Sequence, residues 1–189
     1  MATHLLVDSC SYFRLARVIE PLLGAEFGEP PFDILVVPEL DEEFGKSPNL
    51  QVKFPWVNEQ VYKNNRVANV LAPNCSAFDL RETTKFFKDH KYTKGLGVSK
   101  VDIRVLVVAY LSSATVISDD KDVQEMAKDF GMSECMTSLE VLVWFFEEEI
   151  LTLKEVKTIV RGWKAEKDLP MPPSKFVDAF YDYFGVNPW

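Results

Sequence analysis

Three short runs of consecutive apolar residues constrain the fold of this chain more than any other feature. They span residues 4–8, 34–38 and 114–118, and each is rich in branched side chains and ends at a polar or turn-forming residue. Runs of this length without polar alternation are typical of strands that are buried on both faces, as in a parallel sheet. We therefore expect each run to form one strand of a parallel sheet.

Helical patterns lie between the three runs. Ser11 can cap a helix that continues to Leu23, Ser76 can cap a second helix, and Ser99 can cap a third. Strands that alternate with helices predict an α/β fold with helices on both faces of the sheet. Residues 46–75 are interrupted by Pro, Gly and Asn, and we expect only part of this segment to be helical.

The patterns divide the chain into two regions. Residues 1–136 carry all three expected strands, whereas residues 137–189 show helical patterns alone. The second region includes a capping box formed by Thr152 and Glu155, which predicts the start of a helix. We expect a helical C-terminal extension that packs on the first region or serves for interaction.

Composition narrows the class of protein. The chain has 189 residues, 47% of them hydrophobic, which is enough for an ordinary core, and its net charge of −8 argues against a protein that coats nucleic acid through bulk charge. Its three Cys show no disulfide framework and no metal-ligand spacing. No apolar run approaches the roughly 18 residues of a membrane span, and no signal peptide is evident. We expect a cytoplasmic protein that does not enter a membrane.

Acidic residues follow the expected strands, where ligands of open parallel sheets bind. They are Asp8, Glu39, Asp41, Glu42, Glu43, Asp119, Asp120 and Asp122, and Asp102 joins them in the first turn of the helix capped by Ser99. Crowded carboxylates repel one another unless a cation neutralises them, and oxygen ligands suit Mg²⁺ or Mn²⁺. Such ions support phosphodiester hydrolysis. Taken one at a time, each of these acidic residues is also explained as a simple helix cap, because carboxylates are favoured at helix N-termini.

Several of these residues stand in motifs that resemble the PIN domain of metal-dependent nucleases. The motifs are Val7-Asp8-Ser9, Ser99-Lys-Val-Asp102 followed by Ala109, and Val116 to Asp122 followed by Met126-Ala127 and Gly131-Met132. The resemblance covers about residues 4–136. It implies a PIN-like, Rossmann-like three-layer α/β fold with a central parallel sheet of four or five strands. It also implies an endoribonuclease that uses Mg²⁺ or Mn²⁺ to activate a water molecule.

The same resemblance implies the site residues. The four catalytic and metal-binding positions fall on Asp8, Glu43, Asp102 and Asp120, and further metal contacts fall on Asp122, Glu39 and Asp119. The second motif is a Glu followed by an apolar residue, and both Glu39-Leu40 and Glu43-Phe44 fit it. Spacing favours Glu43, but the choice among Glu39, Glu42 and Glu43 stays open.

The helical tail is similar to that of small prokaryotic PIN proteins, including relatives of VapC-type toxins. The matching residues are Leu139 to Leu142, Ile150, Glu155, Trp163 and Leu169-Pro170. This similarity implies the toxin of a toxin–antitoxin pair, with an antitoxin or another protein as partner and a homo-oligomer as a further possibility. The chain is longer than a typical toxin, however, with an insert over residues 46–95.

A basic stretch precedes Asp102. Residues 81–104 hold seven basic and three acidic side chains, and aromatic residues are interleaved with them. We expect contacts to an RNA substrate from Lys85, Lys88, Lys91, Lys94, Lys100 and Arg104, with Ser118 beside them. The competing interpretation is a solvated helix face whose aromatic residues belong to the core.

Two other functions remain possible from the sequence. One is a Mg²⁺-binding, phosphate-regulated signalling module like a response-regulator receiver, which needs a phosphorylatable Asp after its third strand and a Lys after its fifth. The other is a PIN-fold scaffold that has lost its activity. The presence of all four acidic positions argues against the scaffold.

Overall fold

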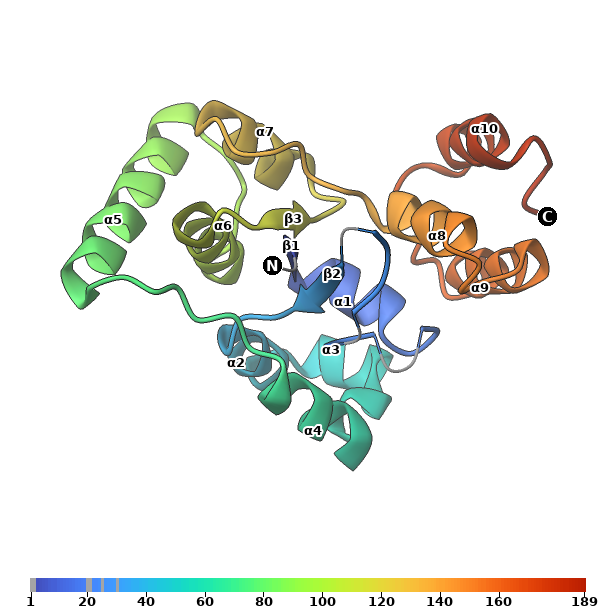
Figure 1. Ribbon diagram of the computed structural model, residues 1–189, viewed down its shortest axis with the longest axis horizontal. Helices are drawn as coiled ribbons and strands as arrows, with labels where there is room; N and C mark the ends of the chain where they lie inside the picture. Colours follow the sequence, from blue (N-terminus) through green and yellow to red (C-terminus); the bar gives the residue numbers. More distant parts are fainter. Residues whose placement is uncertain (1–2, 20–21, 25, 30) are drawn as a thin grey trace. The chain divides into compact units, whose positions relative to one another are not determined.

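A computed structural model describes residues 3–19, 22–24, 26–29 and 31–189 of the chain (Figure 1). The chain divides into two compact units, Met1–Cys135 and Met136–Trp189. Within the ranges that the structure describes, no helix has both the length and the apolar character needed to cross a membrane.

The first unit contains a small parallel sheet. Its strands, in the spatial order β2-β1-β3, are β1 (Thr3–Val7), β2 (Phe32–Leu35) and β3 (Thr115–Ile117). Leu6 of the central strand lies opposite Leu35 on one side and Val116 on the other, and all three side chains are buried. The neighbouring Leu5 and Ile34 point to the opposite face of the sheet and are also buried. The three apolar runs therefore form parallel strands that are covered on both faces.

The expected PIN-like, three-layer α/β architecture with four or five strands is wrong for this chain. About 60% of the residues that the structure describes are helical, and the sheet that these residues form has three strands. Beyond β2, parallel pairing is reduced to a single bridge between Val36 and Val70. The longest apolar run, residues 105–111, follows a capping box and forms a helix rather than another strand.

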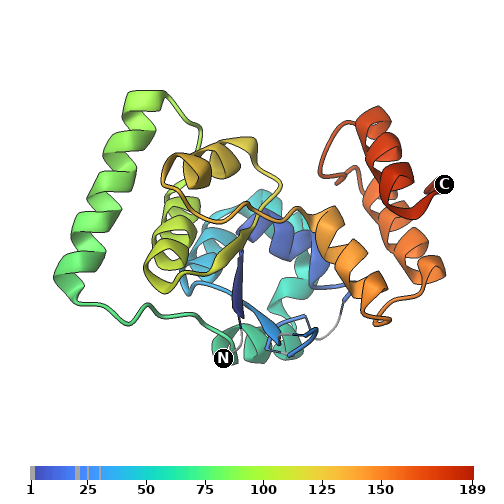
Figure 2. The ribbon, with the colours of Figure 1, turned by 45° about the horizontal axis from the view of Figure 1, so that its top comes forward.

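Helices make up most of the first unit. They are α1 (Ser9–Leu15), α2 (Glu39–Lys46), α3 (Pro48–Lys53), the 3-10 helix η1 (Pro55–Asn58), α4 (Gln60–Ala68), α5 (Ala77–Lys94), α6 (Lys100–Ser112) and α7 (Lys121–Asp129). The helix α6 packs against β1 and β3, and the long helix α5 lies beside α6 (Figure 2).

The helix α1 differs from the sequence expectation at both ends. It begins one turn earlier, because Asp8 rather than Ser11 caps it and accepts the backbone N–H of Ser11 at 2.7 Å. It ends at Leu15 instead of continuing to Leu23. The carboxyl end of β1 is thereby joined to the helix with no intervening loop.

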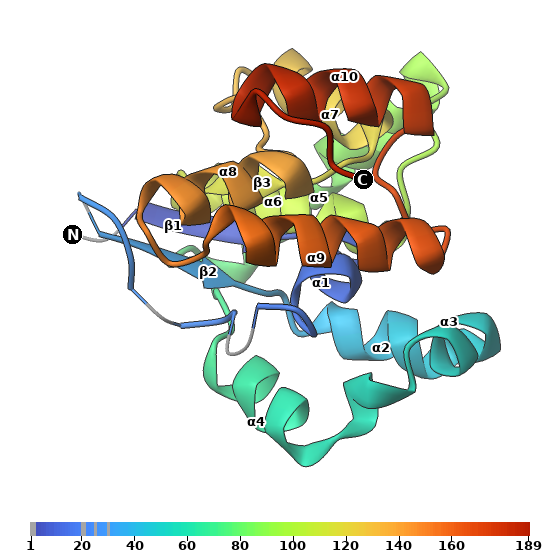
Figure 3. The same cartoon turned by 90° about the vertical axis from the view of Figure 1, so that its right-hand side faces the viewer.

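A cluster of aromatic side chains builds the part of the unit around α2, α3 and α4, which lie together in Figure 3. Phe13 stacks on Phe54 with ring centroids 5.1 Å apart, and Trp56 meets Tyr62 edge to face at 4.5 Å. Such pairs stabilise a fold beyond the area that they bury. The segment 46–75 is therefore held to the unit by its aromatic residues.

Arg66 of α4 ties this cluster together. Its side chain is 4% exposed, and it donates hydrogen bonds to Asp41 of α2 at 2.8 Å, to the hydroxyl of Tyr12 at 3.1 Å and to the carbonyl of Val57 at 3.1 Å. One guanidinium thus links α1, α2, η1 and α4.

The second unit is all helical. Its helices are α8 (Ser138–Glu147), α9 (Leu153–Ala165) and α10 (Pro173–Phe184). Capping boxes at Thr137 and Thr152 open α8 and α9, so the box expected at Thr152 is present. Inside the unit, Phe176 packs edge to face on Trp163, with ring centroids 6.4 Å apart.

We predict that Arg66→Ala lowers the free energy of unfolding by about 2–4 kcal/mol, because it leaves a buried carbonyl and a buried hydroxyl without their donor. Urea unfolding at neutral pH measures the effect. As a control, Lys46→Ala removes only the exposed ion pair with Glu42 and should leave the unfolding free energy essentially unchanged. Equal stability of Arg66→Ala and the wild type would contradict the linking role of Arg66.

Candidate functional site

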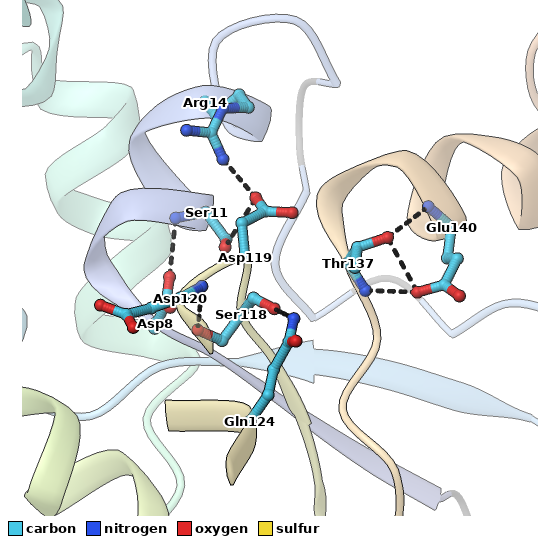
Figure 4. A network of polar contacts seen from close by, with 9 residues as sticks. All are labelled: Asp8, Ser11, Arg14, Ser118, Asp119, Asp120, Gln124, Thr137 and Glu140. Atoms are coloured by element: carbon cyan, nitrogen blue, oxygen red, sulfur yellow. Dashed lines mark hydrogen bonds and ion pairs between the residues drawn. The ribbon is translucent and has the colours of Figure 1, made fainter. Parts of the chain in front are cut away.

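The site begins at Asp8, which directly follows β1. Its backbone N–H donates to the carbonyl of Ile117 at 3.0 Å, so it also adjoins the end of β3. Its carboxyl group accepts the N–H of Ser11, as Figure 4 shows, and a hydrogen bond from the Ser118 side chain lowers its pKa. The residue is 2% exposed. The end of the sheet and the first turn of α1 together enclose this carboxyl group.

Burial raises the pKa of Asp8 from 3.8 to about 7. Loss of hydration is the main cause; the hydrogen bonds from Ser118 and Ser11 oppose it, and the negative charge of Asp102 adds to it. The carboxylate form is therefore poorly compensated by the protein alone. A nearby cation would favour that form.

The charges of three carboxylates act on the neighbouring Cys10, a residue that is exposed as a whole. The pKa of its thiol is raised to about 12, chiefly by loss of hydration and also by the charges of Asp8, Asp102 and Glu43, while Arg14 lowers it. The three acidic residues come from three different elements and form one electrostatic group. The thiol stays protonated at neutral pH, so Cys10 does not have the character of a nucleophile.

The structure distinguishes the three glutamates of α2. The hydroxyl of Ser9 donates to Glu43 at 2.5 Å, which holds Glu43 beside Asp8. Glu39, one turn earlier, forms an ion pair with Arg104 at 3.0 Å. Glu42 pairs with Lys46 at 3.1 Å on the exposed side of the helix. Of the three, Glu43 is the one whose charge acts on Cys10.

Asp102 combines a capping role with its place in this group. It accepts the N–H of Ser99 at 2.9 Å, and its own N–H donates to the Ser99 hydroxyl at 3.1 Å. The capping interpretation is therefore correct for Asp102. It does not exclude the second role, because Asp102 acts electrostatically on both Asp8 and Cys10.

Asp119 and Asp120 follow β3 but point to different partners. The backbone N–H of Asp120 donates to the Ser118 hydroxyl at 3.1 Å, so Ser118 links Asp120 to Asp8. Asp119 instead turns toward Arg14, with which it forms an ion pair, as Figure 4 shows. Asp120 is thus connected to the site through one shared serine, and Asp119 is engaged in a pair of largely buried charges.

Asp122 fixes a loop. It accepts the N–H of Gly97 at 2.5 Å. A Cβ atom at position 97 would lie 2.8 Å from the same carboxylate oxygen, so a side chain would disturb this contact. The loop between α5 and α6 is thereby attached to the first turn of α7.

The expected acidic residues therefore separate into two sets. The charges of Asp8, Glu43 and Asp102 act together on Cys10, whereas Glu39, Asp119 and Asp122 have other partners. Asp120 is connected to Ser118 through its backbone N–H, and its carboxylate accepts the N–H of Asp122 at 2.8 Å. In the described part of the chain, no group of three or more His, Cys, Asp or Glu side chains is arranged to hold a metal ion.

A cleft of about 550 Å³ opens between α2, α5 and α6. Its lining includes Glu43, Thr84, Lys88, Lys100 and Arg104. Glu43 lines this cleft and is also one of the three carboxylates whose charges act on Cys10, so the cleft adjoins the carboxylate group. The lining also includes Lys46, Glu39 and Glu42, and it pairs Arg104 with Glu39 and Lys46 with Glu42. Lys88 and Lys100 are the basic side chains of the lining that are suited to an anionic ligand.

The other basic residues expected to contact nucleic acid are spread over different environments. Lys85 is exposed on α5, whereas Lys91 is half-buried and Lys94 forms an ion pair with Asp129 at 3.2 Å. Ser118 is fully buried, and its hydroxyl contacts Asp8 and the N–H of Asp120. Ser118 therefore supports the acidic group and has no surface to offer a nucleic acid.

The sequence motifs did not predict which residues hold the carboxylates in place. Ser9 and Ser11 are buried and hold Glu43 and Asp8, and Gly97 contacts Asp122. The sequence Asp8-Ser-Cys-Ser11 contained a signal, because small hydroxyl residues beside an acidic residue are common partners for carboxylates.

Comparison of the sequence with models of known protein families gives no match, and comparison with curated proteins gives none either.

We predict that Asp8→Asn removes a pH-dependent loss of stability. Because the pKa of Asp8 is about 7 in the folded protein and near 3.8 in the unfolded chain, the folded protein binds more protons between these values. The wild-type free energy of unfolding therefore falls as the pH rises from about 4 to about 7, by an amount of order 2–4 kcal/mol.

Urea unfolding at pH 5 and pH 8 in EDTA measures this contribution. The stability of Asp8→Asn relative to the wild type should be greater at pH 8 than at pH 5. Glu125→Gln, which removes an exposed charge of α7, should show no such change. A stability difference between Asp8→Asn and the wild type that is the same at both pH values would contradict the raised pKa.

Proposed function

We propose that the protein is a divalent-metal-dependent ribonuclease in which Asp8, Glu43 and Asp102 hold Mg²⁺ or Mn²⁺ and Asp120 assists. The observation that carries the proposal is the buried carboxyl group of Asp8 at the end of β1, with Glu43 of α2 hydrogen-bonded to the adjacent Ser9 and with the charge of Asp102 of α6 acting on Asp8. A buried acid with a strongly raised pKa is a frequent feature of functional sites.

The donor set fits such an ion. Asp8 is a buried carboxyl group, and none of the groups that shift its pKa is positively charged. Glu43 and Asp102 would add two more oxygen donors. Hard oxygen ligands in this number suit Mg²⁺ and Mn²⁺. When bound, an ion of this kind polarises a phosphate oxygen and lowers the pKa of a water molecule.

The residues of the chain would contribute orientation and substrate binding. Ser9 positions Glu43, while Ser11 and Ser118 position Asp8, so the carboxylates are held in place before the substrate arrives. Lys88 and Lys100 line the cleft that Glu43 shares, where they can bind backbone phosphates next to the carboxylates.

The receiver-like alternative has less support. It requires a lysine after a fifth strand, and the sheet formed by the described residues has three strands. Asp119, which follows β3, is also engaged in an ion pair with Arg14.

We predict that Asp8→Asn, Glu43→Gln and Asp102→Asn each reduce Mn²⁺-dependent cleavage of a labelled structured RNA by at least about a hundredfold, because each removes an oxygen donor of the ion. Glu39→Gln, which alters the glutamate paired with Arg104, should lose much less. The measurement is the initial rate of cleavage with Mn²⁺ and with EDTA.

Thermal unfolding provides an independent control. Mn²⁺ should raise the melting temperature of the wild type and of Glu125→Gln but not that of Asp8→Asn, since a ligand stabilises only the form that binds it. Circular dichroism checks that each variant is folded. The proposal fails if the wild type shows no metal-dependent cleavage of RNA, or if Asp8→Asn cleaves at the wild-type rate.

A further inference from the structure

One face of α5 carries a regular stripe of aromatic and basic side chains. From the N-terminal end of the helix, the stripe consists of Phe78, Arg81, Lys85, Lys88 and Tyr92. Their spacings alternate between three and four residues, which keeps all five on one side of an α-helix. The stripe extends along about 21 Å of the helix at 1.5 Å per residue.

All five side chains of the stripe face solvent. Phe78 is 61% exposed and Tyr92 is 77% exposed, although both are large apolar rings, and the three basic residues between them are exposed as well. The guanidinium of Arg81 lies 5.4 Å from the centroid of the Phe78 ring. Exposed rings at both ends of a basic row are unusual on a surface without a partner.

The opposite side of α5 accounts for its packing. Phe87 is fully buried there and stacks on Phe130, with ring centroids 3.7 Å apart. His90 and Lys94 are bound to Asp129 of α7. The stripe therefore contributes little to the attachment of α5, and its rings are contacted by basic side chains of the same helix, Phe78 by Arg81 and Tyr92 by Lys91.

The chemistry of the stripe selects a single-stranded nucleic acid. Three cations in a row match the charges of a phosphate backbone, even though Glu82 and Asp89 border the stripe on one side. Exposed rings next to such cations offer stacking surfaces for unpaired bases, whereas the bases of a duplex are already stacked on one another. The basic side chains alone could equally bind a duplex or an anionic lipid surface. The two exposed rings favour single-stranded nucleic acid over these ligands.

We propose that α5 binds a single strand of RNA along this stripe, with bases stacked on Phe78 and Tyr92 and phosphates held by Arg81, Lys85 and Lys88. Lys88 also lines the cleft that contains Glu43, so a strand on α5 continues toward the carboxylate group. The proposal deepens the proposed function and rests on it for the identification of the strand as RNA, but the binding step needs no metal ion.

The test measures the affinity of the full chain for a short labelled single-stranded oligoribonucleotide by fluorescence anisotropy in EDTA. Phe78→Ala and Tyr92→Ala should each weaken binding by about five- to a hundredfold, as expected for the loss of one stacked base. Tyr92→Phe, which keeps the ring, should bind like the wild type. Lys85→Gln and Lys88→Gln should each lower the salt dependence of binding by about 0.7 in the slope of log affinity against log salt.

Phe86→Ala is the matched control. Phe86 is 65% exposed on the same helix, but it lies on another face and packs edge to face on Phe130. The Phe86→Ala variant should bind the oligoribonucleotide with the same affinity as the wild type. Circular dichroism of each variant checks that α5 remains folded.

Three results would overturn the proposal: unchanged affinity in both Phe78→Ala and Tyr92→Ala, equal affinity for single-stranded and duplex RNA, or binding to vesicles containing phosphatidylserine with no binding to RNA. Because cleavage plays no part in this measurement, its failure is distinct from failure of the proposed ribonuclease. Loss of binding in the ring variants would stand even if no metal-dependent cleavage were found.

Discussion

The buried carboxyl group of Asp8 is the constraint around which the first unit is arranged. Its position at the end of β1 makes it the cap of α1, and its backbone contact with Ile117 brings it to the end of β3. The same enclosure removes water from the carboxyl group and raises its pKa. A carboxylate that caps a helix end in water keeps its hydration, whereas burial makes the ionised form of Asp8 unfavourable. Unfavourable local arrangements of this kind are typical of functional sites.

Local sequence signals predicted those parts of the fold that depend on neighbouring residues. The three apolar runs form parallel strands, and the caps at Ser76, Ser99 and Thr152 open the expected helices. The number of strands depends instead on long-range pairing, which no local run encodes. Residues 46–75, of which only a part was expected to be helical, form the short helices α3 and α4, and tertiary contacts of Arg66 and the aromatic cluster hold them in place.

In the candidate site, too, local sequence signals predict some features and long-range contacts determine the others. Asp8 and Asp102 could be selected from motif and position, but Glu39 and Glu43 lie one turn apart on the same helix, and sequence alone does not separate them. Their partners do, because Ser9 contacts Glu43 and Arg104 contacts Glu39. On α5, residue spacing placed Lys85, Lys88 and Lys91 on nearly one face, yet Lys91 is half-buried beside its neighbours. Which basic residues reach solvent depends on how the helix packs.

The connection between α5 and α6 has a mechanical consequence. Gly95 ends α5 in a left-handed conformation, and Ser99 caps α6, so only residues 96–98 lie between the two helix ends. Gly97 in this short link is bound to Asp122, and the Ser99 cap is bound to Asp102. The link contains no slack segment that could absorb movement. A displacement of the C-terminal end of α5 is therefore transmitted directly to the carboxylates of Asp122 and Asp102.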